Sequence, residues 1–349
     1  MMTPRDMQVG RWRVLSCYTA NLAAYLARFS SDDEVADRIA WSVRLSVQTD
    51  VPDGIDFSHH AEPLNHLHGG DVLIYRGADD PRQALHAEVT SHGCALALTH
   101  SAQMPWALAD DQANPPHLLL VDAVDADHWH VVDHFAGLLP TGEQQPYTGW
   151  IDGDTLLSLM RGHQPFSEEQ ERRNRLVFGF PVPLPDARCR WLERVPSPDY
   201  ALVPPLPGRW LHEPNAVWEF LEERLYEQMI GKSEPKFLDD LWAASQHHRH
   251  RCARLLLSPL CEELGLRPAV EELESRWAQL PRTLRFAAES ARRGRPRAAL
   301  ISAAAGQLAE RERSLRAALA EHDWISHQHV MSTGARNDQQ PNQPRGDSP

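Results

Sequence analysis

The spacing of apolar and polar positions divides the chain into two parts. Up to about residue 180, short helical and strand patterns alternate with frequent turn residues. From 215 to 325 the pattern is almost wholly helical, in four amphipathic segments that predict a bundle. Pro281 predicts a kink or break in the third of these helices. Between the two parts, residues 195–210 hold five prolines in sixteen positions, which favours an extended linker.

Individual elements of the first part follow from the same pattern. Residues 15–29 predict a helix, and residues 32–45 predict a second helix with acidic residues in its first turn. A third helix over 81–93 precedes a buried strand over 94–101. The segment HLLLVDAVDADHWHVVDHF, residues 117–135, predicts a β-hairpin, because two apolar runs flank the polar turn Asp-Ala-Asp.

These patterns predict an α+β domain followed by an all-helical C-terminal domain. We place the first domain at residues 1–194, the linker at 195–214 and the helical bundle at 215–325. Residues 326–349 are polar and contain proline, which predicts a disordered tail.

Composition narrows the class of protein. The 349 residues are 42% hydrophobic and 24% charged, and no apolar run reaches the roughly 20 residues that span a bilayer. With no signal-peptide pattern at the N-terminus, we expect a cytoplasmic protein that does not contact a membrane. A net charge of −13 argues against nucleic acid as a partner. Five widely spaced cysteines without a C-x-x-C pair predict reduced thiols.

The stretch LSCYTANLAAYL places Cys17 in the first turn of a predicted helix, where the helix dipole stabilises a thiolate. A nucleophilic thiol also needs a base and a group that orients the base. The predicted hairpin supplies both, because His117 begins its first strand and Asp133 ends its second. If the open end of the hairpin meets the helix, the three residues form a triad. Taken singly, each has a structural alternative: a packed thiol, a solvent-facing histidine and a turn-forming aspartate.

Other residues near the triad are candidates for substrate binding. His100, Gln103 and Trp106 lie in LTHSAQMPWA, before the hairpin, and Ser16 precedes the nucleophile. For Trp106, core packing is an equal alternative. The histidine clusters in NHLHGG and SQHHRHRC lack carboxylate or cysteine partners at a ligand spacing, so no metal site is predicted. An exposed helix face is the better interpretation of the second cluster. No nucleotide or organic cofactor motif is present.

An early Cys17 followed by PHLLLVDAVDADHWHVVDHF resembles the papain-like fold of the double-glycine leader peptidase superfamily, over residues 10–165 in pattern. Together with LTHSAQMPWA and the helical C-terminal half, the chain looks like the N-terminal domain of the butirosin biosynthesis protein H family. The resemblance implies a papain-like cysteine peptidase fold for the first domain. It also implies transfer of an acyl group from the phosphopantetheine thioester of an acyl or peptidyl carrier protein, through an acyl-cysteine, to an amine. The carrier's phosphopantetheine arm is then the only prosthetic group involved.

One position departs from the papain-like pattern. Those peptidases carry a Gln six residues before the nucleophile as an oxyanion donor, and here that position is Arg11, with Gln8 the nearest amide upstream. An activated thioester tolerates the loss of one such donor better than a peptide does. The leading hypothesis is therefore a cysteine acyltransferase of secondary metabolism that forms an amide. Cys17 attacks the thioester, His117 takes its proton and later deprotonates the amine, and Asp133 orients His117. A cysteine hydrolase (amidase, thioesterase or peptidase) and a non-catalytic binding protein of the same fold are the alternatives.

Three basic runs bear on the carrier partner: residues 171–175, 249–254 and 291–297. Such runs are most often solvated surface. Because the chain as a whole is acidic, they are also the places where an acidic carrier protein would dock. The other expected partner is the small-molecule amine that accepts the acyl group.

Overall fold

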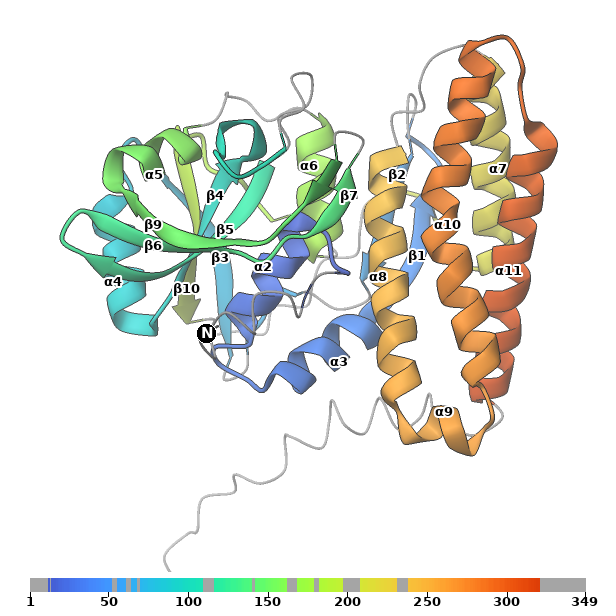
Figure 1. Cartoon of the computed structure of the whole chain (residues 1–349), viewed down its shortest axis with the longest axis horizontal. Coiled ribbons are helices and arrows are strands. Elements are labelled where there is room, and N and C mark those ends of the chain that lie inside the picture. Colours follow the sequence, from blue (N-terminus) through green and yellow to red (C-terminus); the bar gives the residue numbers. More distant parts are fainter. Residues whose placement is uncertain are drawn as a thin grey trace, which may run out of the picture.

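The computed structural model describes most of the chain, and Figure 1 shows a half built around a sheet beside a half built of long helices. The first, which we call the sheet half, runs up to Pro196, and the second, the helical half, comprises the helices after residue 213. The residues described are 12, 14–51, 55–60, 64–67, 70–108, 116–139, 142–161, 168–178, 182–196, 208–230 and 238–320. Most of the predicted linker and the predicted tail therefore lie outside the described residues.

A six-stranded sheet forms the centre of the sheet half, and all its neighbouring strands are antiparallel. In spatial order the strands are β3 (Asp71–Ala78), β10 (Cys189–Pro196), β4 (Ala95–His100), β5 (Pro116–Asp125), β6 (His128–Asp133) and β9 (Tyr147–Asp152). The β5–β6 hairpin predicted from the sequence is confirmed, and it occupies the interior of the sheet.

Helices cover both faces of this sheet (Figure 1). Helix α2 (Cys17–Leu26) packs on the face to which Leu118 and Leu120 contribute, whereas α4 (Arg82–His92) and α5 (Gly153–Met160) pack on the opposite face. The two faces are lined by alternate residues of β5, as the two-residue period of a strand requires. Because both faces are buried, β5 reads in the sequence as a continuous apolar run.

The chain between α2 and β3 departs from the prediction. Ser31 caps α3 (Asp32–Ser42) in a reciprocal capping box with Glu34, as the acidic first turn suggested. The helix ends three residues before the predicted end at 45, and β1 (Val43–Gln48) begins directly. Residues in β1 pair with two other strands, so tertiary pairing overrides the helical pattern here.

Two smaller sheets and two further helical segments complete the structure before the bundle. Strand β1 lies between β2 and β11 in a three-stranded sheet, and β7 pairs with β8. The bounds are β2 (Asp56–His60), β11 (Trp210–Leu211), β7 (Gly137–Leu139), β8 (Gly142–Gln144), the short 3-10 helix η1 (Ser101–Gln103) and α6 (Glu168–Phe178).

The helical half is a bundle in which α10 packs against α7, α8 and α11. Its core surrounds the fully buried Trp277 and also takes in Val47 and Phe57 from the three-stranded sheet. Pro281 does not break α10, which continues through it. The bounds are α7 (Pro214–Ile230), α8 (Leu238–Leu257), α9 (Pro259–Glu263), α10 (Arg267–Arg292) and α11 (Ala298–Ala320). Within the described residues, no helix is both long enough and apolar enough to cross a membrane.

Candidate active site

The β5–β6 hairpin contains an irregularity in its register near the middle of β5. Next to the turn, Asp125 pairs with His128, whereas further along Leu120 pairs with Val132. Between these pairs β5 has one extra residue, Asp122, which forms a β-bulge. A shift of one residue exchanges the faces to which the following side chains point.

Beyond the bulge, the register brings together the two strand ends that carry predicted catalytic residues. Asp133 directly follows Val132, which pairs with Leu120, and His117 lies three residues before Leu120 on β5. The distance of 2.9 Å between His117 Nε2 and Asp133 Oδ1 shows that the two side chains meet there.

The bulge residue is held by charged partners. The Asp122 carboxylate, whose side chain is only 2% exposed, accepts hydrogen bonds from Arg28 at 2.8 Å and from His130 Nδ1 at 2.5 Å. Arg28 follows the C-terminal end of α2, and His130 belongs to the facing strand β6. The ion pair thus fixes the bulge and ties α2 to the hairpin, since a buried carboxylate requires such partners.

Cys17 is the first residue of α2. The preceding residue, Ser16, is the N-cap, and its Oγ accepts a hydrogen bond from the Thr19 amide at 3.4 Å. The Cys17 amide lies in the first turn, where no carbonyl of the helix accepts it and the positive end of the helix dipole is concentrated. Cys17 is half-buried, whereas the other four cysteines of the chain are buried. It is therefore the thiol best placed to react.

His117 contacts both other members of the predicted triad. Its ring is almost fully buried, and Nε2 lies 2.9 Å from Asp133 Oδ1. The same ring interacts with the Cys17 side chain, and this interaction helps to raise the pKa of His117. Because Asp133 occupies Nε2, Nδ1 is the nitrogen left for the thiol. The backbone of His117 is fixed as well, since its carbonyl accepts a hydrogen bond from the Thr99 hydroxyl at 2.9 Å.

Asn21 is a site residue that sequence reasoning missed. It lies one turn after Cys17 on α2, and its Nδ2 donates to Asp133 Oδ1 at 3.0 Å and to the Cys17 carbonyl at 3.1 Å. Its Oδ1 accepts the His134 amide at 2.9 Å. One amide side chain therefore links the nucleophile's helix to the end of β6. The available signal was the four-residue spacing, which places Asn21 on the same helix face as Cys17.

Two aromatic residues surround the histidine and aspartate. Trp106, predicted to line an acceptor pocket, donates from Nε1 to Asp133 Oδ2 at 3.0 Å and stacks on Tyr147 at a centroid distance of 4.0 Å. The Phe135 amide donates to Asp133 Oδ1 at 3.0 Å, and its ring lies edge-on to His117 at 6.0 Å. The Asp133 carboxylate is thus saturated with donors in a mostly apolar surrounding.

These contacts set the charges of the pair. Burial by itself lowers the pKa of His117, but the Asp133 carboxylate and the hydrogen bond with Cys17 outweigh it and raise the pKa to about 10. For Asp133, burial raises the pKa, but His117, Asn21 and Trp106 together lower it below its usual range. At neutral pH the imidazole is protonated and the carboxylate ionised.

The remaining predicted substrate-binding residues contact other parts of the protein. Ser16 is 6% exposed and bonds Thr19 in the helix cap. His100 is buried at the end of β4, opposite Pro116, which precedes His117. Gln103 donates from Nε2 to the Arg161 carbonyl at 3.2 Å. His100 lies opposite the start of β5, and a role toward substrate stays a prediction for all three residues.

The α8 histidines are the one cluster whose predicted environment is wrong. His247, His248 and His250 are buried rather than exposed, because α8 is covered by α3 of the sheet half as well as by α10. Over the part of the chain that the structure describes, no three His, Cys, Asp or Glu side chains come together in a group able to hold a metal ion.

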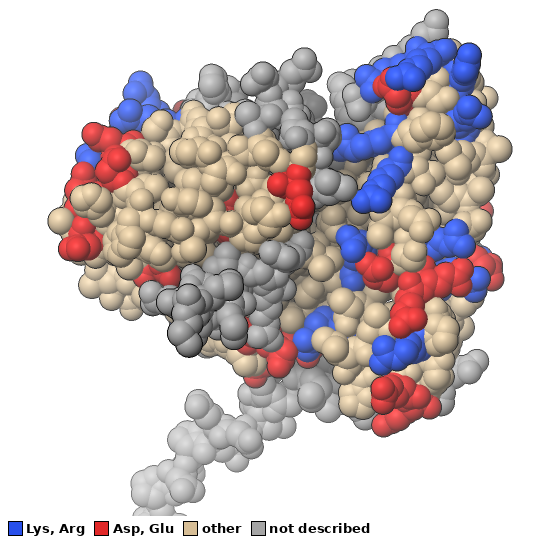
Figure 2. Space-filling view, in the orientation of Figure 1, with Lys and Arg blue, Asp and Glu red and all other residues tan. Residues whose placement is uncertain are grey.

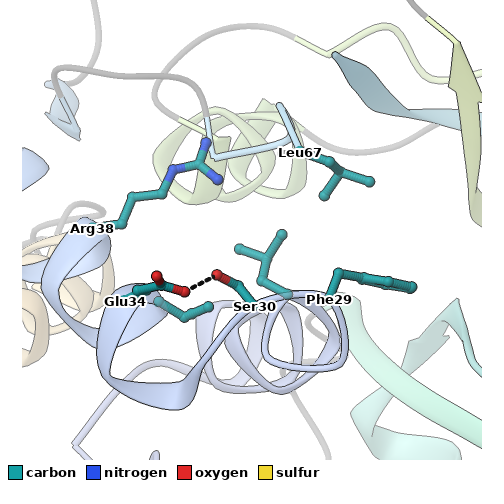
Figure 3. Close-up of a pocket in the computed structure, with 7 residues that line it drawn as sticks. Phe29, Ser30, Glu34, Arg38 and Leu67 are labelled. Carbon is teal, nitrogen blue, oxygen red and sulfur yellow. Dashed lines mark hydrogen bonds between the residues drawn. The ribbon is translucent and has the colours of Figure 1, made fainter. Parts of the chain in front are cut away.

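A small pocket lies away from the triad, at the opposite end of α2 from Cys17 (Figure 3). Glu34 and Ser30 hydrogen-bond each other at its rim. Its lining consists of Leu26, Phe29, Ser30, Glu34, Val35, Arg38 and Leu67. Because none of these residues belongs to the triad, this pocket and the Cys17 site are separate.

The fold and the site together are typical of a cysteine nucleophile: a helix begins with a thiol, and a histidine in contact with an aspartate lies on adjacent strands. No protein-family model matches the sequence, and no curated protein matches it. The chemistry of this site is therefore inferred from its geometry.

Proposed function

We propose that the protein is a cysteine-dependent acyltransferase whose sheet half is papain-like. It moves an acyl group from the thioester of an acyl or peptidyl carrier protein to a small-molecule amine in secondary-metabolite biosynthesis. The observation that carries the proposal is the position of His117, whose Nε2 lies 2.9 Å from Asp133 Oδ1 and whose ring interacts with Cys17 at the start of α2. A nucleophile, a base and an orienting group in this order support acyl-cysteine chemistry.

The raised pKa of His117 determines how the first step begins. Because the imidazole carries a proton at neutral pH, it stabilises negative charge on the Cys17 sulfur. The sulfur attacks the thioester carbonyl, the bond from that carbon to the pantetheine sulfur breaks, and His117 gives its proton to the departing thiolate. The acyl group is then on Cys17 and His117 is neutral. In this proposed order of steps, His117 holds the proton before the attack instead of taking it from Cys17 during the attack.

The second step regenerates the site. The amine nitrogen attacks the acyl-cysteine carbonyl, the bond to Cys17 Sγ breaks, and neutral His117 takes the proton that the amine loses. The net change is a thioester and an amine converted to an amide and a thiol, with no oxidation. Asp133 stays ionised throughout, since its lowered pKa keeps it as the partner of the imidazolium.

Two further features support acyl transfer at this position. The backbone N–H of Cys17, at the start of the helix, is available as an oxyanion donor for the tetrahedral intermediates. On the other side of the base, the Phe135 ring lies between His117 and Trp242 of α8, at 6.0 Å and 6.3 Å from their rings. An apolar wall restricts water near the acyl-enzyme, which favours an amine over hydrolysis.

Two of the basic runs differ in how their arginines are exposed, which favours one of them as a docking surface. In 249–254, Arg251 is buried against Glu312, and Arg254 pairs with Asp37. By contrast, every arginine of 291–297 is exposed. Figure 2 shows Lys and Arg gathered at the upper right, where α10 ends and α11 begins. We propose this run as the place where the acidic carrier protein docks.

Intact mass spectrometry after incubation with a panel of short acyl-pantetheine thioesters tests the proposal. We expect an acyl adduct on the native chain, no adduct on Cys17→Ala, and an unchanged adduct on Cys261→Ala, which removes a buried cysteine of the helical half. Adding amines then discharges the adduct as an amide.

The other outcomes are equally informative. An adduct that yields only the free acid, whatever amine is added, would make the protein a cysteine hydrolase. The absence of any adduct or turnover with every thioester and peptide tried would overturn catalysis altogether. The protein would then be a binding protein with a papain-like arrangement of side chains.

A further inference from the structure

Helix α8 of the helical half reaches the first turn of α2 through His247. This histidine is 1% exposed, and its Nε2 lies 2.9 Å from the Thr19 hydroxyl, two residues after Cys17. Its Nδ1 lies 2.8 Å from the carbonyl of Ala243, one turn earlier on α8. His247 and Thr19 are 228 positions apart in the chain, and their contact thus lies beside Cys17, the proposed nucleophile.

The direction of each hydrogen bond in this chain follows from the chemistry of its ends. The Ala243 carbonyl only accepts, so His247 Nδ1 must carry the proton. Burial lowers the pKa of His247 to about 3, so the ring is neutral and Nε2 is an acceptor for the Thr19 hydroxyl. The Thr19 oxygen then accepts from the Ser16 hydroxyl, 3.1 Å away. The Ser16 oxygen keeps a lone pair that accepts a hydrogen bond from the Thr19 amide. This hydrogen bond caps α2.

We propose that His247 is a positioning residue for Cys17, supplied to the active site by the helical half. By fixing the hydroxyls of Thr19 and Ser16, it holds the helix turn that carries the nucleophile and its backbone N–H. The inference rests on the proposed role of Cys17 as the nucleophile. It makes the docked helical half a part of the catalytic site rather than only a neighbouring domain.

A second contact from the same helix supports this arrangement on the side of the base. Trp242, five residues before His247, packs edge-on against Phe135 at 6.3 Å, and Phe135 in turn packs against His117. Helix α8 therefore approaches the triad at two points, one on the nucleophile's helix and one behind the histidine.

His250 provides a matched control on the same helix. It is also buried, at 8% exposed, and it also bridges the two halves, with Nε2 at 3.0 Å from the Ala36 carbonyl in α3. Its hydrogen-bond partner is a carbonyl of α3, and its ring lies 6.4 Å from that of Trp12. Replacing His250 therefore weakens the contact between the halves without removing a hydrogen bond of the turn that holds Cys17.

The test compares His247→Phe, Thr19→Val and the double variant with His250→Phe, in the full chain. The readouts are the rate of Cys17 alkylation by iodoacetamide across pH, the rate of acylation by an acyl-pantetheine thioester, and the urea midpoint. We expect His247→Phe and Thr19→Val each to lower the acylation rate about five- to tenfold and to change the alkylation pH profile. The double variant should lose no more than either single variant. His247→Gln, which retains an acceptor for Thr19, should recover part of the rate.

His250→Phe is expected to lower the urea midpoint while leaving both rates of the folded protein unchanged. Equal effects of His247→Phe and His250→Phe on the rates, or additive losses in the double variant, would overturn the positioning role. Should His247→Phe fail to fold, Thr19→Val alone decides, because it removes only the hydroxyl. If no thioester acylates the native chain but the alkylation profiles still differ as expected, the proposed function fails and the positioning of Cys17 stands.

Discussion

His117 and His247 are equally buried, at 3% and 1% exposed, yet their proton affinities shift in opposite directions. Burial disfavours the charged imidazole in both cases. For His117 the Asp133 carboxylate reverses the effect and raises the pKa to about 10. For His247 the partners are a neutral hydroxyl and a carbonyl, so burial prevails and the pKa falls to about 3. Burial sets the cost of the charge, and the partner decides whether that cost is offset.

His248 shows that a nearby carboxylate is not sufficient. It lies 3.4 Å from Glu312, and its ring stacks on Trp277 at 4.0 Å. Burial nevertheless lowers the pKa of His248 to about 4, because the attraction to Glu312 is opposed by the charges of Arg251 and Arg316. In the candidate site no arginine neutralises Asp133 in this way among its described contacts, and Asn21 and Trp106 donate to it as neutral groups. Among these three buried histidines, only His117 has a raised pKa.

The largest effect on the difference between His117 and His247 is expected for Asp133→Asn. This variant gives His117 a neutral partner, like the partners of His247. The pKa of His117 should fall, and acylation of Cys17 by thioesters should slow by about 10³- to 10⁴-fold. Single-turnover acylation followed by mass spectrometry across pH measures both effects. Asp127→Asn is the matched control, because Asp127 belongs to the same hairpin but is 66% exposed. An unchanged rate in Asp133→Asn would remove Asp133 from the mechanism.

A smaller effect is expected for Trp106→Phe. The variant keeps an aromatic ring to stack on Tyr147 but loses the hydrogen bond to the Asp133 carboxylate. Because a hydrogen bond to a buried charge is worth about 1.5–3 kcal/mol, acylation should slow by about tenfold or more. If Trp106 orients Asp133, the rate of Cys17 acylation falls by the same factor whichever amine is used. If instead the KM for the amine rises while acylation is unchanged, Trp106 lines the acceptor site.

Local sequence signals predicted the parts of the site that depend on local structure. The apolar runs around Asp-Ala-Asp were sufficient for the hairpin, and the hairpin was sufficient to bring the chain at His117 near that at Asp133. The α+β character of the sheet half and the bundle of the helical half followed from periodicity in the same way. The helix predicted over 32–45 was too long, because the strand β1 from Val43 is stabilised by pairing with distant segments.

The parts that were missed depend on contacts between distant segments. The bulge at Asp122 is stabilised by Arg28, which lies 94 residues away, and no pattern within β5 marks it. Asn21 is polar in a helix of small and apolar residues, and only the position of β6 explains it. From the sequence, the α8 histidines are typical of an exposed polar helix face. They are buried because α3 packs against them. Polar residues in predicted apolar surroundings were therefore the unused signal.

The opposite pKa shifts of His117 and the α8 histidines also predict how the free energy of unfolding depends on pH. His117 acts above neutral pH. The pKa of His117 is raised from 6.5 when unfolded to about 10 when folded, so its protonation stabilises the fold fully below pH 6.5. That contribution is lost as the pH rises toward 10, by up to about 1.4 kcal/mol per pH unit. Urea unfolding of the native chain and His117→Gln between pH 6.5 and 10 should therefore show a difference in unfolding free energy that shrinks with pH. A constant difference would contradict the raised pKa.

The smallest expected effect lies on the acid side, where the α8 histidines act in the opposite sense. Burial lowers the pKa of His250 to about 4, so the folded state keeps this ring neutral while the unfolded chain takes up a proton below pH 6.5. The native chain should lose stability as the pH falls from 6.5 to 4, and His250→Gln should lose it less steeply, by up to about 1.4 kcal/mol per pH unit. Urea midpoints at half-unit intervals measure the two slopes. Equal slopes would mean that His250 is protonated in the folded state. The pKa shifts of His250 and His117 on folding would then not have opposite signs.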